Sequence, residues 1–253
     1  MKRVSVLTLL FFVTLFCSSN AYAQFEGQIM MNLYSNDNGK QEVSTLNLFA
    51  TADRIMLKGE DNYNFMDQVS TDGLLIRNDI KDFIIMTGND QALQVTKKEI
   101  EGLVEMFSSW GGSSSSSGTN GTPDNRYRFS DETREILGHQ AAEMIIENDE
   151  DPNKYLSVWL TPEIDINWGM LAEKWNNMPA DIDKELNGMS QEIIFKRKNF
   201  PLLIEAVDGN KRVKIMETQN VNRSNVAKAM VEIPSGVTLM SFKDYVFKMM
   251  MEQ

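Results

Sequence analysis

The sequence predicts an α+β protein built on a curved antiparallel sheet, a half-barrel covered by helices. Three observations favour this fold class: about ten short apolar segments are bounded by turn residues, no long, uninterrupted helical pattern lies between them, and two segments are apolar throughout. Strands at hairpin spacing pair antiparallel, whereas parallel strands need a longer crossover. Strands that are apolar on both faces must also be covered on both sides.

Two hairpins are the clearest elements. The first joins runs 25–35 and 41–51 through Asn36-Asp37-Asn38-Gly39, and the second joins 201–207 and 211–221 through Asp208-Gly209-Asn210. Asn, Asp and Gly tolerate the positive φ that tight turns require. Further strands are predicted at 54–58, 73–77, 82–87, 126–137, 140–147 and 154–161.

Three segments have helical periodicity. Each carries one apolar stripe, and they span 97–110, 166–186 (with Pro179 interrupting it) and 241–252. We expect these helices to pack on the sheet. Binding to a membrane surface or to a partner helix is the alternative.

The N-terminus has the three parts of a cleavable signal peptide. Lys2 and Arg3 precede an apolar run at 4–16, and Ala21-Tyr22-Ala23 provides small residues around a cleavage site near Ala23/Gln24. We therefore expect a periplasmic or secreted protein with no transmembrane segment in the mature chain. A lipid anchor at Cys17 is the alternative, although bulky Phe16 does not fit it.

The mature chain, 24–253, is predicted to be a single domain. Residues 111–125 include five consecutive serines, Ser113–Ser117, and too little apolar surface to fold, so they predict a flexible insertion. A boundary between two subdomains is the alternative.

Charge and cysteine content exclude several function classes. Cleavage would leave 23 basic and 36 acidic residues, a net charge of −13, which disfavours nucleic acid as a partner. It would also remove the single cysteine, Cys17, and with it any disulfide or thiol chemistry.

Catalytic and metal sites are not predicted. His139 would be the single histidine of the mature chain, too few for the usual zinc site, and no Gly-x-Ser-x-Gly elbow is present. The acidic residues near 147–151 lack the glycine and closing glutamate of a calcium loop. We predict no cofactor, no metal and no enzymatic activity; an enzyme that uses His139 is the weakest alternative.

The strands with continuous apolar residues are the candidate binding surface. Segments 74–76 and 83–86 would be covered by helices on one face, while the other could curve around an apolar ligand. The predicted lining residues, with two tryptophans from a covering helix, are Met56, Leu74, Ile76, Phe83, Ile85, Met86, Trp168 and Trp175.

Several segments together are similar to a known family. They are 25–29, 136–139, 158–162, 200–202 and 231–237, and in this order they resemble the exported bacterial family known as domain of unknown function 4412. The resemblance implies a distant relation to periplasmic lipoprotein carriers, which hold acyl chains in a half-barrel closed by helices. It implies no catalytic residues.

The leading hypothesis is therefore a periplasmic binding protein that holds a lipid or acyl chain. The alternative is a cell-envelope scaffold or protein-interaction module without a small ligand, whose concave face would be filled by its own side chains. An envelope protein would then be the partner.

Overall fold

The computed structural model describes residues 23–37, 40–65, 69–88, 90–102, 127–148, 151, 153–176 and 191–251. The predicted signal peptide, apart from Ala23, and the serine-rich insertion lie outside these residues. So do positions 103–110 and 177–186 of two predicted helices.

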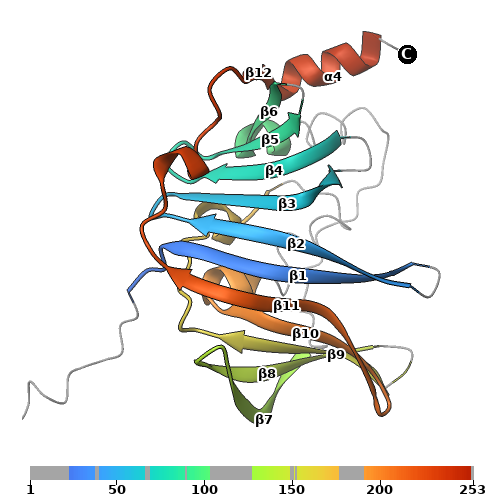
Figure 1. The fold of residues 1–253 in the computed structure, drawn as a ribbon. Coiled ribbons are helices and arrows are strands. Elements are labelled where there is room, and N and C mark those ends of the chain that lie inside the picture. The colour runs from blue at the N-terminus through green and yellow to red at the C-terminus, as the bar shows by residue number, and fades with distance from the viewer. Residues whose placement is uncertain are drawn as a thin grey trace, which may run out of the picture.

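The described strands form one open sheet in the order β12-β6-β5-β4-β3-β2-β1-β11-β10-β9-β8-β7 (Figure 1). Their bounds are β1 (Gly27–Asp37), β2 (Lys40–Ala50), β3 (Arg54–Phe65), β4 (Val69–Arg77), β5 (Asp82–Gly88), β6 (Gln91–Thr96), β7 (Tyr127–Ile136), β8 (His139–Glu147), β9 (Lys154–Thr161), β10 (Phe200–Asp208), β11 (Lys211–Arg223) and β12 (Thr238–Ser241). The predicted antiparallel sheet is confirmed, and each of its ten predicted strands overlaps an observed one. β6 and β12 were not predicted.

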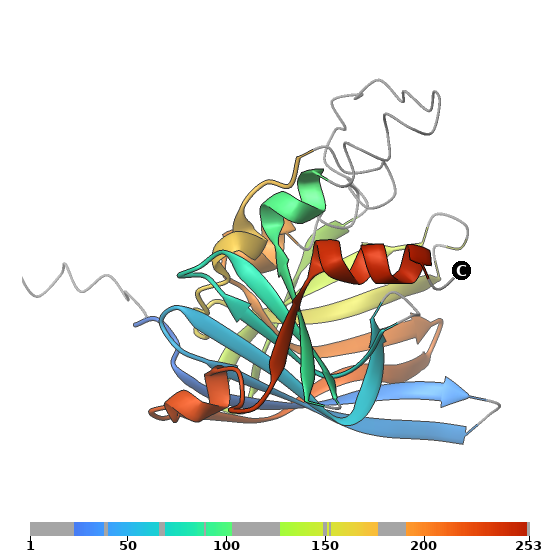
Figure 2. The same cartoon turned by 90° about the horizontal axis from the view of Figure 1, so that it is seen from above.

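The sheet consists of two meanders. Strands β1 to β6 form the first and β7 to β11 the second, and the pairing of β1 with β11 joins them. These neighbours all pair antiparallel, whereas β12 pairs parallel with β6 at the edge of the first meander. Figure 2 shows that the joined sheet is strongly curved.

The described helical segments are short. They are helix 97–102, η1 (Gly169–Ala172), η2 (Gln191–Lys196), η3 (Lys228–Val231) and α4 (Phe242–Met251). The prediction that helices cover the sheet is not confirmed, because these segments shield only parts of it. None of the described helices is long and apolar enough to cross a membrane.

Reciprocal caps explain where two of the helices begin. The backbone N–H of Glu99 donates to Thr96 Oγ1 at 3.1 Å, and Glu99 Oε2 accepts from the Thr96 backbone N–H at 2.8 Å. At the start of α4 the Asp244 N–H donates to Ser241 Oγ at 3.1 Å, and the Ser241 hydroxyl donates to Asp244 Oδ2 at 2.7 Å. Such capping boxes satisfy N–H groups that the first helical turn leaves free.

The helix predicted at 166–186 is largely wrong within its described part. Only η1 is helical there, and Ile164, Ile166, Trp168 and Met170 alternate with less buried residues. A period of two is typical of extended chain, so tertiary burial selects a mostly extended conformation despite a sequence with helical spacing.

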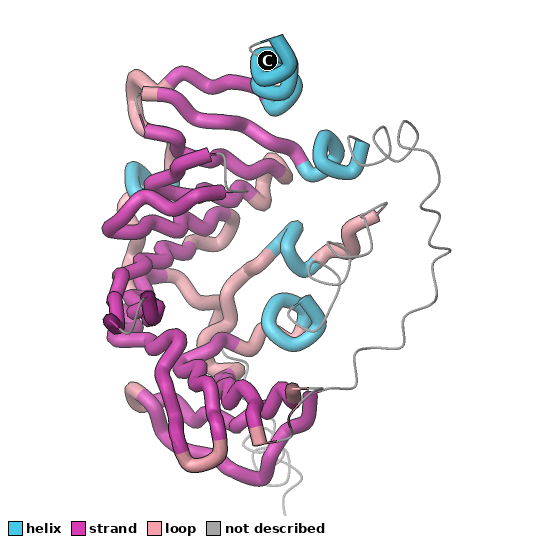
Figure 3. Tube along the Cα trace, turned by 90° about the vertical axis from the view of Figure 1, so that its right-hand side faces the viewer, coloured by secondary structure: helices cyan, strands magenta, loops and turns pink. Residues whose placement is uncertain are grey.

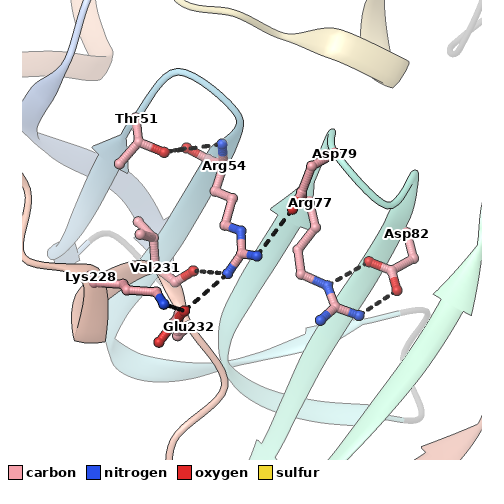
Figure 4. A network of polar contacts seen from close by, with 8 residues as sticks. All are labelled: Thr51, Arg54, Arg77, Asp79, Asp82, Lys228, Val231 and Glu232. Carbon is pink, nitrogen blue, oxygen red and sulfur yellow. Dashed lines mark hydrogen bonds and ion pairs between the residues drawn. The ribbon is translucent and has the colours of Figure 1, made fainter.

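A segment that we call the strap, residues 224–237, leaves β11 and crosses the convex face of the sheet to reach β12 (Figure 1). Its Val231 is buried in a cluster on that face, with Met56, Leu75, Ile84, Met86 and Ala92. Figure 4 shows how Arg54 holds the strap: its guanidinium donates to the Val231 carbonyl at 3.4 Å and lies 3.6 Å from Glu232.

Candidate functional site

The concave face of the first meander is apolar along its pairing register. One row of paired residues crosses five strands, Leu48, Leu57, Leu74, Ile85 and Leu93, and the next contains Ala50, Ile55, Ile76, Phe83 and Val95. Because side chains alternate along a strand, the intervening residues of these strands point to the convex face.

A similar row continues into the second meander. From Leu33 on β1 it passes through paired residues on the five strands β11 to β7, namely Met216, Ile204, Val158, Met144 and Phe129. The apolar concave face therefore extends across both meanders.

One part of this face is covered by an extended stretch that we call the inner segment, residues 162–176, together with η2. The buried side chains of the inner segment in the main core are Ile164, Ile166, Trp168, Met170 and Trp175. The Trp175 ring stacks on Phe83 with centroids 6.0 Å apart, and Ile193 of η2 packs on Met144 and Val158. Figures 2 and 3 show the helical parts of this cover on the concave side.

Polar contacts fix the inner segment to the sheet. The Asn78 side-chain amide donates to the Asn167 carbonyl at 2.9 Å, and its oxygen accepts from the Met170 N–H at 3.3 Å. Glu173 accepts hydrogen bonds from Lys81 at 2.8 Å and from Lys97 at 3.1 Å. The hydrogen bond from Lys81, aided by Lys97, holds the pKa of Glu173 below its ordinary value.

A second cover lies over the β5 and β6 side of the concave face. It consists of helix 97–102 and α4, whose Ile100, Phe242 and Tyr245 pack against the cluster formed by Ile85, Leu93 and Val95. The second cover is thus attached mainly through partly buried side chains.

Four partly exposed leucines lie on neighbouring strands of the concave face beside these covers, and we call them the leucine strip. They are Leu33 on β1, Leu46 on β2, Leu57 on β3 and Leu74 on β4. Each packs on the main core, and Leu74 also contacts the cluster beneath the second cover. The strip is a surface of four adjacent strands on which an apolar group can be buried.

The structure brings six of the eight predicted lining residues together. Leu74, Ile76, Phe83 and Ile85 share the concave face, and Trp168 and Trp175 pack over it from the inner segment. All except Leu74 are buried by the protein's own side chains.

Met56 and Met86 do not lie with the other six. Both pack in the convex cluster beneath the strap. Their placement on the concave face is corrected by strand register: Met56 pairs with Leu75, not with Leu74, and one residue along a strand reverses the direction of the side chain.

Three members of the strip, Leu33, Leu46 and Leu57, were not among the predicted residues. The signal for the first two was in the sequence, because apolar residues alternate in the runs 25–35 and 41–51 that predict the first hairpin. Alternation identifies one apolar face, but it does not say which apolar residues the rest of the chain will cover.

The single histidine of the described residues lies away from the strip, at the start of β8. His139 Nδ1 is 3.0 Å from Glu163 Oε2, and the Gln140 N–H donates to the other oxygen of that carboxylate at 3.3 Å. Within the described residues, no group of three or more His, Cys, Asp or Glu side chains could hold a metal ion.

Comparisons with known proteins give distant structural similarity and no family. No protein-family model matches the chain and no curated protein matches its sequence, so the resemblance to domain of unknown function 4412 is not supported. One similar solved structure is a LolA-superfamily protein from Nitrosomonas europaea, at 7% identity and a TM-score of 0.30, covering 84% of this chain and 92% of that one.

Two further solved structures are similar to this chain, one of comparable length and one much longer. An uncharacterized conserved protein from Thermus thermophilus is 8% identical with a TM-score of 0.38, covering 85% of this chain and 91% of that one. PNGF-II is 12% identical with a TM-score of 0.42, and although 90% of this chain is covered, it spans only 33% of the PNGF-II chain. Identities at this level transfer no activity.

Proposed function

We propose that this protein is an exported, non-enzymatic binding protein of the periplasm that holds an apolar ligand, a lipid or acyl chain, on the leucine strip. The observation that carries the proposal is the set of partly exposed leucines on four adjacent strands of a curved sheet. In this proposal the curved sheet acts as the half-barrel, and the inner segment and α4 are its covers.

The contrast between the two faces of the sheet supports a ligand. Where the convex face of β1 to β3 is not under the strap, it carries polar residues such as Gln28, Asn32, Asn47 and Lys58. The concave face keeps leucines at partly exposed positions. Apolar surface gains about 25 cal/mol per Å² when it leaves water, so an apolar ligand would be stabilised there.

The side chains of the strip also restrict the ligand class. Leucine offers no hydrogen-bond donor or acceptor, so the part of the ligand in contact with it must be apolar. Acyl chains meet this requirement and can lie across several strands, which neighbour one another at about 4.8 Å.

The first test is direct. Protein purified from its native envelope is extracted, and the extract is analysed for lipids by mass spectrometry. The purified protein is also titrated with dansyl-undecanoic acid. We expect a reproducible co-purifying lipid and saturable fluorescence enhancement. A consistently empty protein that also ignores the probe would contradict the proposal.

Variants then place the ligand on the strip. Leu57→Gln should weaken probe binding about tenfold or more, because a polar amide replaces roughly one leucine's worth of apolar contact. Leu57→Trp keeps the surface apolar but fills it, and should also weaken binding. The matched control is Val43→Gln, at a residue on the convex face that is 53% exposed, which should bind as the unmodified protein does.

The alternative, a scaffold or protein-interaction module, is favoured by a specific observation. Ile76, Phe83 and Ile85 are buried by the chain's own side chains, so much of the concave face is already filled. This alternative expects no lipid and no probe binding in the tests above, but recovery of one envelope protein after cross-linking in cells.

A further inference from the structure

The two covers of the concave face differ in how they are attached. The inner segment is held by buried side chains and by polar contacts to Asn78, Lys81 and Lys97. The inner segment also donates a hydrogen bond to helix 97–102, from the Asn176 N–H to Glu101 Oε1 at 3.0 Å. Opening this cover would break hydrogen bonds and ion pairs as well as apolar contacts.

The unit formed by β12 and α4, which we call the flap (residues 238–251), has fewer attachments. β12 contributes four residues, Thr238 to Ser241, paired in parallel with Gln91 to Gln94. Parallel pairing is slightly less stable per residue than antiparallel pairing. In the described part of the flap, no side-chain hydrogen bond or ion pair reaches another element, and Ser241 and Asp244 bond to each other.

The flap also exposes large apolar side chains. Leu239 is 41% exposed and Phe247 is 65% exposed, while Phe242 and Tyr245 are only partly buried where they pack on the sheet. Elements with few buried apolar contacts open at lower free energy than the core of a protein. The flap is therefore held more weakly than the inner segment.

The strap gives the flap a fixed base and a turn at which to pivot. Val231 is buried on the convex face and Arg54 binds its carbonyl, so the strap is anchored up to this point. A tight turn follows, in which the Val237 N–H donates to the Pro234 carbonyl at 3.3 Å and Gly236 adopts a φ of +92°. Glycine permits this φ, and small changes at such a turn reorient the chain beyond it.

We propose that the flap opens about the turn at 234–237 and admits the apolar ligand to the leucine strip. The inference rests on the proposed function. Its geometric basis is that Phe242 and Tyr245 of the flap pack on the cluster that Leu74 of the strip also contacts. Opening of the flap uncovers this side of the strip, while the inner segment keeps the core closed.

A reversible lock tests the flap. Ala92 and Leu239 are paired across β6 and β12, and adjacent strands suit the Cα separation of a disulfide. The full chain carrying Cys17→Ser, Ala92→Cys and Leu239→Cys has no other thiol. The matched control bridge is Asn32→Cys with Thr45→Cys, a pair across β1 and β2 away from the flap.

Loading is followed by stopped-flow fluorescence with dansyl-undecanoic acid. When oxidised, the flap bridge should slow loading at least about tenfold, because the opening that precedes entry is blocked. Reduction should restore the rate, and the control bridge should leave it unchanged. If the unmodified protein binds the probe and the oxidised flap bridge does not slow loading, the proposal that the flap opens is wrong, while the proposed function stands.

Hydrogen exchange provides a readout that needs no ligand. Amides of β12 and α4 should exchange together and at least about a hundredfold faster than those of β1, and oxidation of the flap bridge should slow the α4 amides as well. If the amides of β12 exchange as slowly as those of β1, the proposal that the flap opens is wrong. Absence of probe binding by the unmodified protein would instead overturn the proposed function and the flap's role in loading together.

Discussion

At the scale of single residues, Arg77 and Asp82 form a largely buried ion pair. Asp82 is fully buried and accepts two hydrogen bonds from the guanidinium, at 2.7 Å and 2.5 Å, and a third from Gln94 Nε2 at 2.6 Å (Figure 4 shows the first two). The hydrogen bond with Asp82 raises the pKa of Arg77. A buried pair of this kind is stable only while both partners are present.

Asp82→Ala should lower the free energy of unfolding by about 3 to 5 kcal/mol, because it leaves the mostly buried guanidinium of Arg77 without a counter-charge. Urea denaturation followed by circular dichroism measures the change. The control is Asp79→Ala, which removes a carboxylate 36% exposed and paired with Arg54. Its cost should stay below about 1 kcal/mol, and equal effects of the two variants would contradict the argument.

At the scale of elements, strands with clear alternation and tight turns could be predicted, and short edge elements could not. β6 has polar residues at Gln91 and Gln94, and β12 has only four residues. Neither segment shows a clear alternation of apolar and polar residues. Both form strands because a neighbouring strand offers an edge to pair with. The helix predicted for the inner segment was wrong for a related reason. Its tryptophans have helical spacing, but its contacts with the sheet favour an extended chain.

Glu173 links three elements, because it belongs to the inner segment and binds Lys81 of the β4–β5 turn and Lys97 of helix 97–102. Its pKa is lowered in the folded protein, mainly by the hydrogen bond from Lys81, so its stabilisation is complete above the ordinary value of 4.5. This contribution is lost as the pH falls through the lowered pKa, when the folded carboxylate takes up its proton.

Glu173→Gln should therefore cost stability at neutral pH and cost less as the pH falls. Because the carboxylate is 42% exposed, solvent screening should keep the loss at pH 7 to about 1 kcal/mol or less. Urea denaturation of both proteins at neutral pH and at about pH 3 measures the difference. A difference that grows on acidification would contradict the sign of the pKa change.

At the scale of the whole molecule, the pairing of β1 with β11 makes one sheet from two meanders. Gly27 lies at the start of this seam, opposite Arg223, with a φ of +152°. A Cβ added at Gly27 would lie 2.1 Å from the Asn222 carbonyl oxygen, which is closer than any real contact. The seam therefore requires glycine at this position.

Gly27→Ala should lower the free energy of unfolding by at least about 2 kcal/mol, because both the backbone conformation and the close approach of β11 become strained. The matched control is Gly102→Ala, at a position where an added Cβ meets nothing within 4 Å. It should be neutral or slightly stabilising, since alanine favours helix. Thermal unfolding of the two variants compares them, and an equal, small effect would contradict the role of the seam.

The antiparallel sheet and most of its strands could be predicted from the sequence alone, because alternation and turn residues act over a few neighbouring positions. Tertiary structure alone decided which apolar residues are covered. Met56 and Met86 lie under the strap, Ile76 and Phe83 lie under the inner segment, and the leucine strip stays partly exposed. The reason is physical: register sets the face on which a side chain points, and contacts between residues distant in sequence set what covers it.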